Sequence, residues 1–176
     1  ASAAMFLNST ELPYEYTKYY ALYQIFNPNP KQVLAIGAGA YSVPKAFLED
    51  SPDVTVDVSE IDPVLIDIGK NYFNVTDDPR LTTIIKDGRR MLHDTDKKYD
   101  VIFSDAYASF FSSPTHLTTQ EFFQLAKDHL TDNGVFIANV AGSLENKPKS
   151  FFLSEVKTFR QVFDNTYFFA VISPKS

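Results

Sequence analysis

Three acidic residues, Glu60, Asp87 and Asp105, each come at or directly after the end of an apolar, strand-like run. In open α/β sheets the carboxyl ends of the parallel strands form one edge, and ligands bind there. Carboxylates at that edge can accept hydrogen bonds from hydroxyl and amino groups, and they can take a proton from a nucleophile. The three acids therefore indicate a polar ligand site at the carboxyl edge of a sheet.

The first of these acids belongs to a pattern that includes a glycine loop. Gly37-Ala38-Gly39 directly follows an apolar run, and Glu60 lies 23 residues after Gly37. Glycine has no Cβ, so the backbone of such a loop can approach a ligand closely, and an acid at this distance can accept hydrogen bonds from ribose hydroxyls. A helix that begins near Ser42 turns its N-terminus toward the same point. The pattern predicts a nucleoside-binding βαβ unit.

The other two acids also suggest chemistry, and each has a structural alternative. Asp87, followed by Gly88, can accept from an adenine amino group while the backbone after it donates to the ring; the alternative is a simple turn. Asp105 can orient an amine, accept its proton or balance a sulfonium charge; the alternative is a loop or helix cap. We interpret Asp62 as a helix cap and His116 as an incidental loop residue.

Strand-like and helix-like runs alternate along most of the chain. This order predicts an α/β, Rossmann-like fold with a mostly parallel, doubly wound sheet and helices on both faces. The predicted strands are Gln32 to Ile36, Val54 to Ser59, Leu81 to Lys86, Asp100 to Ser104, Gly134 to Val140 and Thr166 to Ile172. The predicted helices begin near Ser42, at Pro63, at Phe122 behind a capping box at Thr118 to Glu121, and near Ser150.

Aromatic residues are concentrated near both ends of the chain. In the leading segment they fall on one helical face: Tyr16, Tyr19, Tyr20 and Tyr23. We favour packing of this face on the domain or on a second subunit, as in a homodimer, over a role in gating a substrate. The last helix carries a stripe that we interpret as core: Phe152, Val156, Phe159 and Phe163. We expect a tyrosine-rich helical segment over residues 1–30 and a single nucleoside-binding domain over residues 31–176.

Composition narrows the range of partners. The 176 residues carry 16 basic and 22 acidic side chains, and the net charge of −6 argues against nucleic acid or an anionic membrane as the main partner. There is no cysteine, and the three histidines lack metal-ligand spacing, so we expect no metal. No run approaches the roughly 18 apolar residues of a membrane span. We therefore expect a cytoplasmic protein, or the soluble domain of a larger membrane protein.

A series of short motifs occurs in a characteristic order: Gly37-Ala38-Gly39, Glu60-Ile61-Asp62-Pro63, Asp78-Pro79-Arg80-Leu81, Asp87-Gly88-Arg89, Lys98-Tyr99-Asp100-Val101-Ile102 and Asp105. Over residues 28–172 the chain thereby resembles the spermidine synthase (polyamine aminopropyltransferase) branch of the class I S-adenosylmethionine-dependent methyltransferase fold. The resemblance implies that a nucleoside donor, S-adenosylmethionine or its decarboxylated form, is bound by Gly37, Ala38, Gly39, Glu60, Ile61, Asp87 and Gly88. It also implies that Asp105 faces the attacking amine.

Two positions depart from that family's pattern. Ala40 and Ala108 stand where polyamine synthases usually carry acids. Both changes remove charge that would hold an aminopropyl donor or a polyamine. Aminopropyl transfer to an amine is the leading hypothesis; the alternatives are methyl transfer from S-adenosylmethionine and a non-catalytic nucleoside-binding or assembly module. A nicotinamide-dependent dehydrogenase ranks last, because the third loop glycine usual in such enzymes is Ser42 and because Asp105 would have no role.

Overall fold

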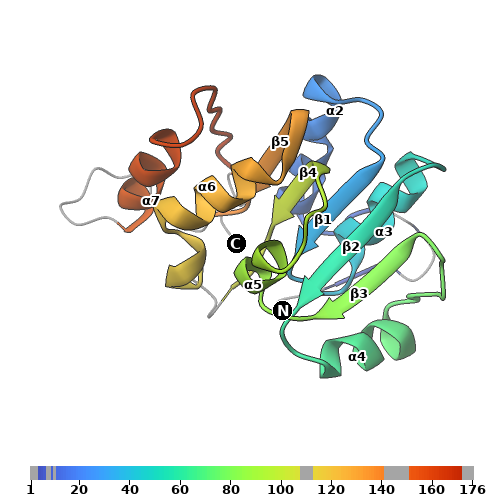
Figure 1. Ribbon diagram of the computed structural model, residues 1–176. Helices are drawn as coiled ribbons and strands as arrows, with labels where there is room; N and C mark the ends of the chain where they lie inside the picture. Colours follow the sequence, from blue (N-terminus) through green and yellow to red (C-terminus); the bar gives the residue numbers. More distant parts are fainter. Residues whose placement is uncertain (1–3, 7–8, 10, 108–112, 141–150, 172–176) are drawn as a thin grey trace.

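The computed structural model describes residues 4–6, 9, 11–107, 113–140 and 151–171. Five strands form one parallel sheet in the order β3-β2-β1-β4-β5 (Figure 1). They are β1 (Gln32–Ile36), β2 (Thr55–Glu60), β3 (Leu81–Ile85), β4 (Tyr99–Ser104) and β5 (Leu130–Ala138). The strand order reverses between β1 and β4. A ligand crevice is therefore expected beyond the carboxyl ends of these two strands.

Helices cover both faces of the sheet, which confirms the predicted fold class. The helices after the strands are α3 (Ser42–Asp50), α4 (Val64–Tyr72), α5 (Gly88–His93), α6 (Gln120–Asp128) and α7 (Phe151–Arg160), with a 3₁₀ turn, η2 (Thr115–Leu117), before α6. Val33 and Ala35 of β1 join a core with α3, whereas Leu34 and Ile36 join a second core with α5 and α6. Successive residues of a strand point to opposite faces, so the continuous apolar run of β1 is buried on both sides. Within the described ranges, none of the helices has the length and apolar character to cross a bilayer.

The N-terminal segment is helical and packs on the sheet beside α3. It consists of α1 (Glu15–Lys18), the 3₁₀ turn η1 (Tyr19–Leu22) and α2 (Tyr23–Phe26). Tyr20 and Tyr23 are buried against Phe47, with ring centroids 5.0 Å from it in both cases. Their hydroxyls donate to one carboxylate oxygen of Asp50, at 2.8 and 3.0 Å. Packing on the domain is thus observed for these two tyrosines.

The predicted sixth strand is wrong over residues 166–171, which form no strand; residue 172 lies outside the described residues. The aromatic residues there match the composition of a strand, but β-propensity reflects packing on a pleated surface rather than an intrinsic backbone preference. Here the rings pack on the N-terminal segment instead. Tyr167 contacts Phe26 with ring centroids 5.5 Å apart, and Phe169 contacts Tyr19 at 6.1 Å.

Helix α5 was not predicted, because its six residues are too few to show a helical period. The cap of α6 is Thr119, whose side chain accepts from the backbone N–H of Phe122, rather than Thr118.

Strand β5 begins at Leu130 rather than at Gly134. Its pairing with β4 shifts register, since Tyr99 pairs with Leu130 but Val101 pairs with Val135. The residues predicted to form a turn before the strand therefore lie inside this irregularity.

Candidate active site

A cavity of about 1730 Å³ opens at the carboxyl edge of the sheet. It is bounded by the residues that follow β1, β2, β3 and β4 and by the N-terminal helical segment, and it continues along β5 to α7. All the site residues predicted from the sequence line it: Gly37, Ala38, Gly39, Glu60, Ile61, Asp87, Gly88 and Asp105. The structure thus brings the three acids to one space.

The glycine loop lies against the end of β4. Gly37 has a φ of +95°, and a Cβ atom there would come within 2.8 Å of the backbone oxygen of Asp105. Gly39 has a φ of +51°, with open space where a Cβ would lie. Gly37 is therefore required by both its conformation and its close approach to β4, whereas Gly39 is required by conformation alone.

Glu60, the last residue of β2, is only 6% exposed, and both of its oxygens are held by backbone groups. Oε2 accepts from the N–H of Ala38 at 2.8 Å, and Oε1 accepts from the N–H of Asp62 at 2.9 Å. Each oxygen retains capacity for a further hydrogen bond, so the carboxylate can accept from a pair of hydroxyls. Ile61 is 70% exposed at the rim. The Asp62 carboxylate accepts from the N–H of Val64, the first residue of α4, at 3.0 Å. Asp62 thus bonds to the start of the helix as interpreted, although Pro63 is the residue at the N-cap position.

Asp87 caps α5 and also contacts the segment after β4. Oδ1 accepts from the N–H of Arg90 at 3.0 Å, and Oδ2 lies 2.7 Å from Nε2 of His116. Burial favours the neutral carboxyl, but the bonds with His116 and with backbone N–H groups together hold the pKa of Asp87 below its usual value. Gly88 packs on Ile36 with no room for a Cβ. Asp87 is thus both a helix cap and a cavity residue, and His116 is its partner rather than an incidental loop residue.

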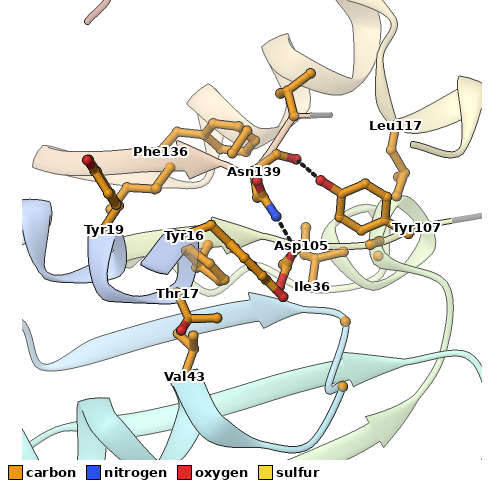
Figure 2. A pocket seen from close by; sticks show the side chains of 18 of the residues that line it. Tyr16, Thr17, Tyr19, Ile36, Val43, Asp105, Tyr107, Leu117, Phe136 and Asn139 are labelled. Carbon is orange, nitrogen blue, oxygen red and sulfur yellow. Dashed lines mark hydrogen bonds between the residues drawn. The ribbon is translucent and has the colours of Figure 1, made fainter. Parts of the chain in front are cut away.

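Among the residues that the structure describes, Asp105 has fewer hydrogen-bond partners for its side chain than the other two acids. Asn139 Nδ2 donates to Oδ1 of Asp105 at 2.9 Å, and the Tyr107 hydroxyl donates to the Asn139 backbone oxygen at 3.2 Å. Figure 2 shows Tyr16 of α1 reaching toward the same carboxylate. Burial raises the pKa of Asp105 to about 6, although the bond from Asn139 opposes this. Burial and the nearby Asp105 also raise the pKa of Tyr16 to about 12.

Two neighbours of Asp105 were not identified from the sequence. Asn139 comes directly after β5, so a search for all polar residues after strands, rather than acids alone, would have found it. Tyr16 belongs to the tyrosine face of the leading segment. No signal in the sequence separates it from Tyr20 and Tyr23, which are core residues.

The geometry defines the kind of molecule that the cavity can hold. Hydroxyls can bind at Glu60, an amino group on a ring can bind at Asp87, and an amine that is cationic or about to lose a proton can face Asp105. Among the described residues there is no group of three or more histidines or acids arranged to hold a metal ion. The three acids supply hydrogen-bond acceptors and, at Asp105, a carboxylate able to take up a proton.

The chain is similar in sequence to curated proteins that are named polyamine aminopropyltransferases. The chain is 33% identical over 150 residues to the polyamine aminopropyltransferase of Vibrio vulnificus (strain CMCP6), covering 84% of this chain and 48% of the relative. It is 32% identical over 148 residues to the polyamine aminopropyltransferase of Thermococcus onnurineus (strain NA1), covering 82% and 51%. The chain thus spans about half the length of these relatives.

Solved structures and a family model agree with these relatives. A spermidine synthase in complex with the transition state analogue AdoDATO matches with a TM-score of 0.72 and 28% identity, covering 85% of this chain and 52% of the other. Human methyltransferase-like protein 13 in complex with SAH matches with a TM-score of 0.71 and 26% identity, covering 88% and 75%. The model described as the spermine/spermidine synthase domain matches residues 20–176. The chain therefore belongs to the spermine/spermidine synthase family.

Proposed function

We propose that this chain binds decarboxylated S-adenosylmethionine or S-adenosylmethionine and transfers an alkyl group, in the first place aminopropyl, to an amine. The observation that carries the proposal is the meeting of Glu60, Asp87 and Asp105 in one cavity. The aminopropyl form is supported by the relatives named polyamine aminopropyltransferase and by the spermidine synthase solved with AdoDATO.

On this proposal the donor nucleoside lies along the carboxyl ends of β1, β2 and β3. Glu60 accepts hydrogen bonds from the ribose hydroxyls, and Asp87 accepts from the adenine amino group. The glycine loop fits such a ligand, because the backbone at Gly39 leaves open space where a side chain would stand. The carboxylates of Glu60 and Asp87 are already oriented by hydrogen bonds to other protein groups, so little reorganisation is needed when the donor binds.

The acceptor amine lies at Asp105. A sulfonium donor supplies an activated carbon and a good leaving group, so the protein need not provide a nucleophile. Asn139 bonds Oδ1 of Asp105, and we assign Oδ2 to the amine. Because the pKa of Asp105 is about 6, its carboxylate is mostly ionised at neutral pH and can accept the proton that nitrogen loses as the N–C bond forms. Alignment of the amine with the donor carbon supplies much of the remaining rate enhancement.

Methyl transfer from S-adenosylmethionine is the second candidate. Ala40, in the glycine loop, is buried and offers no charge to hold the amino group of an aminopropyl tail. The match to human methyltransferase-like protein 13, solved with SAH, supports the same alternative. The two candidates share the nucleoside site and differ in how the donor's tail is held.

Calorimetric titration with three nucleosides tests the proposal. S-adenosylmethionine, its decarboxylated form and methylthioadenosine are titrated in parallel into the chain. Tighter binding of the decarboxylated donor than of S-adenosylmethionine supports aminopropyl transfer, and the reverse order supports methyl transfer. If none of the three binds, the proposal is contradicted and a non-catalytic assembly module is favoured.

A further inference from the structure

Tyr41, the residue directly before α3, has an unusual backbone conformation. Its φ is +57°, in the left-handed region that bulky side chains rarely adopt. Such a conformation is strained and persists only where the surrounding structure fixes it. The N–H of Tyr41 donates to the backbone oxygen of Ala38 at 2.8 Å, so Tyr41 belongs to the same turn as the glycine loop. The strain therefore lies in the loop that lines the cavity.

Gly69 is unusual for its place in the interior of α4, where alanine would favour the helix more. A Cβ atom at Gly69 would come within 2.9 Å of the Tyr41 ring. Tyr41 is only 1% exposed, and its hydroxyl lies 3.1 Å from the hydroxyl of Thr83 on β3. The glycine thus makes room for the ring, and contact with α4 and β3 holds Tyr41 in its strained conformation.

The two elements that Tyr41 and Gly69 join are also joined by Glu60. Glu60 accepts from the N–H of Ala38, in the glycine loop, and from the N–H of Asp62, just before α4. Burial raises the pKa of Tyr41, and the nearby Glu60 carboxylate adds to the rise. The separation between the glycine loop and α4 therefore decides whether both bonds to Glu60 can form at once.

We propose that Tyr41 is a positioning residue for Glu60: its ring, packed on α4 at Gly69, fixes the separation of the glycine loop and α4 and so orients the carboxylate before a ligand binds. The effect on the donor rests on the proposed function, whereas the orientation of Glu60 does not. A carboxylate that is already oriented loses less freedom when it accepts from ribose hydroxyls. Tyr41 should therefore increase the selectivity of the site for nucleosides that carry both hydroxyls.

Hydrogen exchange of the ligand-free chain tests the orientation of Glu60. NMR follows the Ala38 amide, which donates to Glu60, and the amide of Leu34, a core residue of β1, which reports global opening. In Tyr41→Gly the Ala38 amide should exchange at least about tenfold faster relative to Leu34 than in wild type, as expected when a bond to a charged group is weakened. Tyr41→Phe keeps the ring and should behave like wild type. An unchanged ratio in Tyr41→Gly would overturn the inference.

Gly69→Ala tests the contact without removing the ring, and it serves where Tyr41→Gly does not fold. The new methyl group should displace the ring, so Tm should fall although alanine favours a helix, and the Ala38 amide should again exchange faster relative to Leu34. Asn71→Ala, at an exposed position of α4, is the matched control and should neither lower Tm nor change the exchange. A Tm at or above that of wild type with unchanged Ala38 exchange in Gly69→Ala would overturn the inference.

A pair of nucleosides tests the consequence for the donor. Methylthioadenosine and its 2′,3′-dideoxy analogue differ only in the ribose hydroxyls, and both are titrated by calorimetry. Wild type and Tyr41→Phe should bind methylthioadenosine at least about tenfold more tightly than the analogue, and Tyr41→Gly and Gly69→Ala should lose most of this preference. An undiminished preference in both of these variants would overturn the role of Tyr41. If wild type binds neither nucleoside, the proposed function fails, while hydrogen exchange still decides whether Tyr41 orients Glu60.

Discussion

The two halves of the cavity hold their carboxylates in opposite ways. In the half assigned to the donor, Glu60 accepts two backbone N–H bonds, and Asp87 has a lowered pKa with bonds to Arg90 and His116. In the half assigned to the acceptor, Asp105 has a raised pKa, and within the described part of the chain its carboxylate has one side-chain partner, the amide of Asn139. The difference suggests that the first half is organised before a ligand binds, whereas the second half keeps the carboxylate of Asp105 available for a cation or a proton.

The largest expected effect is on turnover in the acceptor half. Asp105→Asn keeps the shape of the side chain and its ability to accept the bond from Asn139, but it cannot take a proton or attract an ammonium. Turnover should fall about 10²- to 10⁴-fold, the usual contribution of a general base, with little change in donor affinity. Single-turnover rates and calorimetry measure the two quantities. Unchanged turnover would remove Asp105 from the mechanism.

The matching change in the donor half should affect binding instead. In Glu60→Gln, one of the two oxygens becomes an N–H₂ group that cannot accept from the backbone or from a ribose hydroxyl. Donor affinity should fall about 10- to 100-fold, because hydrogen bonds to charged groups contribute about 1.5–3 kcal/mol. The rate at saturating donor should be largely retained. A Tm close to that of wild type is the control, and a variant that binds the donor normally would contradict the assignment of Glu60.

A smaller effect is expected where the two halves meet, at Gly37. Gly37→Ala places a methyl group against the Asp105 backbone in a conformation with positive φ, so unfolding free energy should fall by about 1–3 kcal/mol. Gly39→Ala is the matched control, because it has positive φ but open space around the Cβ position, and it should cost less. Denaturant unfolding compares them. Equal losses would show that conformation alone, rather than contact with β4, requires Gly37.

The smallest effect is a pH dependence of stability. The pKa of Asp105 is about 6 in the folded chain, above the ordinary 3.8, so between these values the native state binds more protons than the unfolded state. Stability contributed by the neutral carboxyl is present below about pH 4 and is lost as pH rises through 6. Asp105→Asn should therefore be more stable than wild type above pH 6 and equal to it near pH 4, as measured by thermal unfolding. A constant difference across this range would contradict the burial of the carboxylate.

The sheet and the donor half followed from local patterns in the sequence. Continuous apolar runs marked the strands, and the position of an acid after a strand brought Glu60, Asp87 and Asp105 to one edge. These features are local in sequence, because the strand direction fixes where the next residue lies. The predicted sixth strand failed because its rings pack on Tyr19 and Phe26, which are distant in the chain.

The acceptor half was less predictable for the same reason. Tyr16 lies in the N-terminal segment, Asn139 at the end of β5 and the buried Glu155 on α7. Only tertiary packing brings them to one cavity. The aromatic stripe of the last helix was predicted to be core, and Phe159 and Phe163 do pack on the second core. Glu155 lies among the apolar residues of this stripe and is also buried. An acid within an apolar stripe of a helix indicates a buried charge. A search of the sequence for acids in such stripes would have identified Glu155.

Product analysis tests the central claim most directly. The chain is incubated with decarboxylated S-adenosylmethionine and 1,4-diaminobutane, and mass spectrometry follows both products. In the proposed reaction a carbon–sulfur bond breaks, a nitrogen–carbon bond forms and the nitrogen loses one proton. The account predicts an aminopropylated diamine and methylthioadenosine in equal amounts, and the loss of both in Asp105→Asn. A chain that binds donor and diamine but forms neither product would contradict the account.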